Sequence, residues 1–170
     1  MIRRLIIAAS GALLSACALH PLYGGGSSGA VAGTLRQVSV APIPGRNGWL
    51  VYNKLKERLG ETGEGGSAYR LEVELDDDII GLGIRGDRAV TRERRTLRAR
   101  YQLVSVSNGQ VVLDATAGSD AGIDVVSSEY ATVAAEQSAL ERLSGVIADQ
   151  IVARLGLFMA SGVKPDPALR

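Results

Sequence analysis

Seven arginines lie close together near the middle of the chain, and their side chains could bind an anion. They fall within sixteen residues, at Arg85, Arg88, Arg92, Arg94, Arg95, Arg98 and Arg100. A guanidinium group can donate two parallel hydrogen bonds, so this residue type suits phosphate and carboxylate groups. The cluster could therefore form an anion-binding surface, or it could supply ion pairs within the fold.

The alternating pattern of the flanking segments assigns part of this cluster to ion pairs. Arg98 and Arg100 would lie on the polar face of a strand, opposite Glu72 and Glu74 of the preceding strand. The other arginines have no obvious partner in the sequence. The candidate anion-binding residues are therefore Arg85, Arg88, Arg92, Arg94 and Arg95; without such a ligand they would be solvated or would contact a protein partner.

Cys17 is the second candidate for chemistry, because it ends an export signal. Arg3 and Arg4 precede an apolar run of about ten residues, the layout of a secretory signal peptide. As a helix that run would be about 15 Å long, roughly half a bilayer core, so we do not expect it to span a membrane. Leu14-Ser15-Ala16-Cys17 resembles the lipobox of bacterial lipoproteins.

The lipobox resemblance implies that the Cys17 thiol is diacylated, that the chain is cut before it, and that the new amine is often acylated too. Two or three acyl chains anchor a protein stably in a membrane. The alternative is an ordinary signal peptide followed by a free cysteine, although a lone cysteine is unusual in an exported protein. Ala18 stands where an inner-membrane retention signal would carry Asp, which favours the outer membrane.

Catalysis, a cofactor and a metal site are not expected. His20 is the only histidine and lies beside the anchor, so no Ser-His-acid or Cys-His arrangement can be assembled. Gly81–Gly86 spells G-x-G-x-x-G but leads into a strand, whereas a dinucleotide site needs a helix there; the glycines fit a long hairpin loop better. Asp76–Asp78 could suggest a metal site, but adjacent carboxylates on a strand point to alternate sheet faces and cannot all converge on one ion. These charges would instead protect a strand edge.

Composition indicates one globular domain that does not bind nucleic acid. The chain of 170 residues has 19 Lys+Arg, 18 Asp+Glu and 46% hydrophobic residues, and its aromatic content of 4% is too low for a base-stacking platform.

We expect a cleaved signal peptide over residues 1–16 and a lipidated, Gly/Ser-rich tether over 17–33. The domain itself is expected over 34–158 and a disordered tail over 159–170.

Hydrophobic periodicity predicts the element order β-α-β-β-β-α. A strand is expected over 35–40, then a helix with Asn47 as N-cap and Gly60 as its stop. Three alternating segments, beginning at Tyr69, Leu97 and Val111, read as an antiparallel meander, while 120–126 could be strand or loop. A long helix should run from about Glu129 to Leu155. The prediction is an α+β two-layer sandwich, with two helices on one face of a four-stranded mixed sheet.

These features together resemble the LptE family of lipopolysaccharide-assembly lipoproteins. The resemblance rests on Pro21-Leu22-Tyr23-Gly24 soon after the lipobox and on the element order with its long last helix. The pattern Thr-x-x-x-x-x-Leu-x-Ala-x-Tyr, which ends at Tyr101, adds to it. The resemblance implies a non-enzymatic, lipid-anchored protein on the periplasmic side of the Gram-negative outer membrane. It also implies that the protein plugs and helps assemble the LptD β-barrel and binds lipopolysaccharide through the loop arginines.

A second family of proteins remains open at this stage. Auxiliary lipoproteins of ABC-type lipid transport systems can share a tethered α+β domain. Such a protein would have a permease or an MCE-domain protein as its partner in place of a β-barrel.

Overall fold

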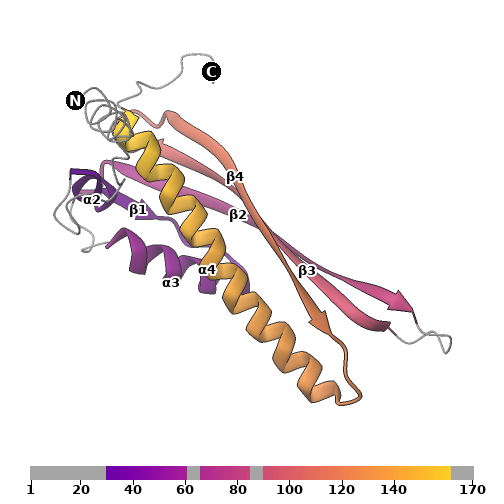
Figure 1. Ribbon diagram of the computed structural model, residues 1–170. Helices are drawn as coiled ribbons and strands as arrows, with labels where there is room; N and C mark the ends of the chain where they lie inside the picture. The colour runs from indigo at the N-terminus through magenta and orange to yellow at the C-terminus, as the bar shows by residue number, and fades with distance from the viewer. Residues whose placement is uncertain (1–29, 61–65, 85–89, 162–170) are drawn as a thin grey trace, which may run out of the picture.

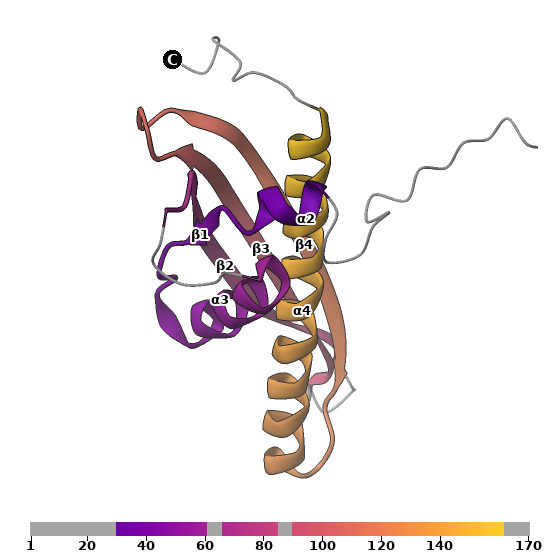
Figure 2. The same ribbon diagram turned by 90° about the vertical axis from the view of Figure 1, so that its left-hand side faces the viewer.

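Two layers make up the protein, a β-sheet and a set of helices on one of its faces (Figures 1 and 2). The computed structural model describes residues 30–60, 66–84 and 90–161. Within these ranges the elements are α2 (Ala30–Leu35), β1 (Val38–Val40), α3 (Gly45–Leu59), β2 (Tyr69–Ile84), β3 (Val90–Ser105), β4 (Val111–Asp124) and α4 (Glu129–Ser161). The predicted α+β class and the order β-α-β-β-β-α are confirmed, and α2 is an additional helix.

The sheet has the strand order β1-β2-β3-β4 and is mixed, as predicted. The short β1 pairs in parallel with the beginning of β2, and the three long strands form an antiparallel meander. The turn between β3 and β4 contains Asn108-Gly109, in which Gly109 has a φ of 71° that glycine adopts without strain. The turn brings Val104 opposite Val111, and an irregularity at the next step shifts the register by one residue, so that Leu103 pairs with Leu113 and the rest of the ladder follows from there.

Odd-numbered residues of the three long strands face the helices and form the core. Leu71, Leu97, Ala99, Tyr101 and Leu103 are buried on this side of the sheet. They pack against the apolar stripes of the two long helices, which contribute Val51, Leu55 and Leu59 from α3 and Leu140, Leu143, Ile147, Ile151 and Leu155 from α4. Even-numbered strand residues therefore lie on the opposite, helix-free face.

The helix α4 crosses the sheet and is the longest element of the fold (Figure 1). Its 33 residues correspond to a length of about 50 Å. By length and composition alone it could span a bilayer, but it packs on the sheet and on α3 through its buried face. Val133 shares the apolar spacing of that buried face but is 56% exposed, because the first turns of α4 extend beyond the core.

Several predicted boundaries were wrong at the N-terminal side of the domain. Ala30–Leu35 is helical, so the strand predicted over 35–40 begins only at Val38, and the last residues assigned to the tether belong to α2. Helix α3 begins at Gly45, and Asn47 lies within it, where its side chain bonds to Asp77 of β2 and caps nothing. The predicted stop at Gly60 is confirmed, with a left-handed φ of 64°.

The strands and α4 extend further than the sequence indicated. β2 runs on to Ile84, so Gly81 and Gly83 belong to the strand end. Gly83 has a φ of 70° and lies between the pairs Leu82–Arg92 and Ile84–Val90, across which the β2–β3 register is unchanged. The segment left open as strand or loop continues β4 as far as Asp124. Ser128 caps α4 by accepting a hydrogen bond from the Ala131 amide, and the helix passes Gly156 to end at Ser161.

Candidate anion-binding face

Four arginines of β3 project from the helix-free side of the sheet. Arg92, Arg94, Arg98 and Arg100 occupy even positions of the strand, and we call the surface that they form the arginine face. Rows of acidic residues flank it on the two neighbouring strands: Glu72, Glu74, Asp76 and Asp78 on β2, and Asp114, Asp120 and Asp124 on β4. The face is therefore a basic stripe between two acidic stripes, and its charge is mixed.

Two of the four arginines are neutralised by β4. Arg100 Nη2 donates to Asp114 Oδ2 at 2.9 Å, and Gln102 donates to the same oxygen at 2.8 Å. Hydrogen bonding, first by Arg100 and then by Gln102, lowers the pKa of Asp114 below its usual value. Arg92 Nε donates to Asp124 at 3.0 Å. The ion pairs predicted for Arg98 and Arg100 with Glu72 and Glu74 are not found among the described residues. Arg100 faces Glu74 in the register but binds Asp114, and Arg98 faces Asp76.

The remaining two arginines, Arg94 and Arg98, face glycines of β4. Their partners in the register are Gly122 and Gly118, which have no side chain to offer a counter-charge. Within the described part of the chain, neither arginine forms an ion pair. The sheet face thus presents two solvent-exposed guanidinium groups that are free to bind an anion.

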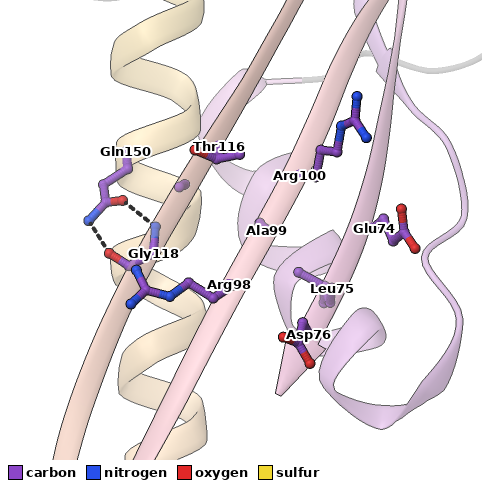
Figure 3. A pocket seen from close by; sticks show the side chains of 10 residues that line it. Glu74, Leu75, Asp76, Arg98, Ala99, Arg100, Thr116, Gly118 and Gln150 are labelled. Carbon is purple, nitrogen blue, oxygen red and sulfur yellow. Dashed lines mark hydrogen bonds between the residues drawn. The ribbon is translucent and has the colours of Figure 1, made fainter. Parts of the chain in front are cut away.

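The Arg98 side chain lies directly across Gly118, beside a shallow hollow of about 410 Å³ (Figure 3). A Cβ atom at position 118 would clash with the Arg98 guanidinium, so glycine is required for this placement. On the other side of β4, Gln150 of α4 accepts from the Gly118 amide at 3.0 Å and donates to its carbonyl at 3.2 Å. The helix thereby covers the backbone of the edge strand at the point where Arg98 rests.

Arg95 lies on the opposite face of β3, in a buried polar cluster. Its Nε and Nη2 atoms donate to the two Asp77 carboxylate oxygens at 2.8 and 2.5 Å, and its Nη1 donates to the Glu136 carbonyl of α4 at 3.1 Å. Asn47 of α3 donates to the same carboxylate at 3.0 Å. The hydrogen bond with Asp77 raises the pKa of Arg95. Arg95 thus connects β3 with β2 and α4, and Asp77 extends the cluster to α3. Because Asp77 already neutralises it, Arg95 is not available on the arginine face.

The predicted set of five arginines is therefore divided. Arg92 and Arg94 lie on one face and Arg95 on the other, while Arg85 and Arg88 lie outside the described residues, as does Cys17. Arg98, which the sequence had assigned to an ion pair, replaces Arg95 as a candidate ligand. Strand parity could have revealed this, since Leu97, Ala99 and Tyr101 place odd positions in the core.

The described residues offer no cluster of three or more His, Cys, Asp or Glu side chains placed to hold a metal ion. Asp76–Asp78 alternate between the two faces, as their strand position requires, and Asp77 is occupied by Arg95. What this arrangement of side chains can do chemically is bind an anionic group at the arginine face.

Solved structures of bacterial proteins share this fold. A chain from Caulobacter crescentus named as a lipoprotein has a TM-score of 0.64 and 23% identity, over 76% of this chain and 96% of that one. A minor lipoprotein from Acinetobacter baumannii has a TM-score of 0.58 and 16% identity, over 71% and 90%. Lipoprotein B from Nitrosomonas europaea also has a TM-score of 0.58, with 14% identity, over 74% and 84%. At these identities the likeness concerns the fold.

A search of curated protein sequences finds no match to the chain. The family model described as LptE, lipopolysaccharide-assembly, matches residues 35–155. That range begins at the end of α2 and includes the whole sheet, α3 and most of α4. The match covers well over half of the chain and every strand of the domain, and so the chain belongs to the LptE family of lipopolysaccharide-assembly proteins.

Proposed function

We propose that the protein is anchored by acyl chains on Cys17 to the periplasmic side of the outer membrane, where it plugs and helps assemble the LptD β-barrel and binds lipopolysaccharide on its way to the outer leaflet. The family match over residues 35–155 is the observation that carries this proposal. The order of the chain supports it, because a lipobox cysteine precedes the domain by a short Gly/Ser-rich segment. The role requires no catalytic residue.

The arginine face supplies a chemical reason for lipopolysaccharide binding. Lipid A carries phosphate groups, and Arg94 and Arg98 are exposed guanidinium groups without an ion pair among the described residues. Phosphate oxygens accept paired hydrogen bonds from such groups. Arg85 and Arg88, which follow β2 in the sequence, are further candidate ligands for the same phosphates. Arg92 would join it when Asp124 releases it.

Lipopolysaccharide binding is tested by charge reversal on the arginine face. The variant Arg94→Glu/Arg98→Glu should lose most of its affinity for purified lipopolysaccharide, measured with the full-length protein in detergent. The matched control is Arg142→Glu/Arg154→Glu, which makes the same change of charge at exposed positions of α4. Equal loss in the two variants would mean that net charge, and not the arginine face, governs binding. A separate variant that reverses Arg85, Arg88 and Arg92 tests the loop.

The barrel partnership is tested by capture from native membranes. The tagged full-length protein is extracted in mild detergent, and co-purifying proteins are identified by mass spectrometry. A large β-barrel protein in stoichiometric amount is the expected result. An ABC permease or an MCE-domain protein in its place would contradict the proposal and would favour a role as an auxiliary lipoprotein of lipid transport.

A further inference from the structure

The outer edge of β2 is unpaired over most of its length. β1 pairs only with Tyr69–Leu71, and within the described residues the rest of β2 is bonded on one side, to β3. Odd-numbered residues of β2 direct their backbone groups away from β3, as shown by the Ala41 amide, which donates to the Leu71 carbonyl at 2.9 Å. Asp76–Leu82, which we call the open edge, therefore presents backbone donors and acceptors outward at positions 77, 79 and 81.

The helix-free side of the open edge is acidic. Asp76 and Asp78 are both exposed there, at even positions of β2. Arg98 is the neighbour of Asp76 in the register, but its side chain turns toward Gly118 on the far side of β3 (Figure 3). A strand added at the open edge would place alternate side chains beside these two carboxylates. Basic residues are favoured at such positions, because opposite charges on neighbouring strands attract.

The helix side of the same edge opens into a crevice that is part apolar and part polar. The first turn of α3 lines this crevice, and beyond it the first turns of α4 diverge from the far end of the β2–β3 hairpin (Figure 1). The crevice has a volume of about 450 Å³. Its apolar lining is Ile79, Tyr130, Val133, Ala134 and Leu140, and its polar lining is Arg46, Asn47, Arg95, Glu136 and Gln137. Tyr130 is 85% exposed and Ile79 is 38% exposed, which are large values for apolar side chains that line a cavity.

We propose that the open edge binds an extended segment of a partner protein, in which basic and apolar residues alternate. Successive side chains of a strand point to opposite faces, so one set would lie beside Asp76 and Asp78 and the other would enter the crevice. The backbone of the segment would bond to positions 77, 79 and 81 of β2. This inference goes beyond the proposed function and does not depend on it, because it uses neither Arg94 nor Arg98.

A second copy of this chain is a poor occupant for the open edge. Pairing two open edges would bring the Asp76 and Asp78 carboxylates of one copy against those of the other, and like charges on neighbouring strands repel. The free side of β4 is no better, because its helix-free residues include Asp114, Asp120 and Asp124. The charge pattern therefore selects a different protein.

The test uses the full-length protein in a zwitterionic detergent and one defined probe, the capped peptide Lys-Val-Lys-Val-Lys-Val-Lys. Hydrogen–deuterium exchange read by mass spectrometry should show slower exchange over 76–82 when the peptide is present. The variant Asp76→Lys/Asp78→Lys should bind the peptide about tenfold more weakly, because two cross-strand attractions become repulsions. The control Asp120→Lys/Glu141→Lys, with the same change of charge elsewhere, should bind as the wild type does.

Two further peptides separate strand addition from simple charge attraction. A peptide with the same side chains but N-methylated at every residue cannot donate to the ladder from either edge. A Glu-Val peptide has the wrong charge, and neither peptide should protect 76–82. Protection by either of them, absence of protection by the Lys-Val peptide, or equal weakening in the two charge variants would overturn the proposal. Binding of lipopolysaccharide and capture of the barrel, measured on the same variants, should stay unchanged, so failure here is distinct from failure of the proposed function.

Discussion

Replacing Asp77 by alanine should destabilise the domain strongly, because it leaves the Arg95 guanidinium buried without its counter-charge. The Arg95 side chain is 12% exposed and the Asp77 side chain 10%. The Asp77 carboxylate accepts two hydrogen bonds from Arg95 and one from Asn47. Removing one partner of a buried ion pair costs about 3 kcal/mol of unfolding free energy, since the remaining charge is desolvated and unpaired. We expect Asp77→Ala to show a loss of that size in urea unfolding of the full-length protein followed by circular dichroism.

The double variant Asp77→Val/Arg95→Met should recover most of this loss. It replaces both charged groups by apolar side chains at positions that face the helices beside Leu75 and Leu97. Because neither charge remains to be desolvated, its unfolding free energy should lie within about 1 kcal/mol of the wild type. The single variants Asp77→Val and Arg95→Met form with this double variant a cycle that isolates the interaction between the two residues.

An exposed Arg–Asp pair that joins β3 to β4 provides the matched control. Arg92 and Asp124 are 62% and 76% exposed, and an ion pair in water contributes about 0.5 kcal/mol or less. Asp124→Ala should therefore leave the unfolding free energy nearly unchanged. The reasoning would be refuted if Asp77→Ala cost no more than Asp124→Ala, or if the double variant were as unstable as Asp77→Ala.

Two helical glycines should respond to alanine in opposite directions when the unfolding free energy is measured in urea. Gly48→Ala should lower it by about 2 kcal/mol, because the new Cβ would lie 2.5 Å from the Ile43 carbonyl oxygen. Gly145→Ala should raise it by up to about 1 kcal/mol, because alanine favours the helix and has room there. The variant Gln150→Ala should free the backbone of Gly118, which amide exchange would detect as faster exchange at the middle of β4. Burial raises the pKa of Tyr101, so the folded state holds this proton more tightly than the unfolded chain does. Stability present below about pH 10 should therefore fall as the pH rises further, and Tyr101→Phe should reduce that fall.

Sequence patterns predicted the architecture well wherever one face of a helix or strand is buried and the other is exposed to solvent. Alternation at Tyr69, Leu71 and Val73 marked β2, and the apolar spacing along α4 marked its buried stripe, because burial on one face imposes a period. The turn Asn108-Gly109 located the β3–β4 hairpin. These signals are local and need no knowledge of the partner strand.

Predictions from the sequence were wrong where tertiary contacts determine the local structure or the partner of a side chain. The helix α2 contains Gly33 and Thr34, which are poor helix formers, but it packs on α4 and buries Leu35. Asn47 has the residue type of a helix cap, but its partner is thirty residues away on β2. The separation of Arg95 from the arginine face was readable from parity, whereas its bond to Asp77 depended on a β2–β3 register that the sequence did not define.

The position of β1 has a consequence for the order in which the domain folds. The three long strands pair with their neighbours in sequence, so the meander can form from local contacts with a small loss of chain entropy. In contrast, Val40 pairs with Leu71, which is thirty-one positions away in the sequence, and the parallel connection between their strands includes α3. During synthesis the N-terminal segment emerges first, and we expect it to join the sheet last. The part of the domain nearest Cys17 would thus be the last to become structured.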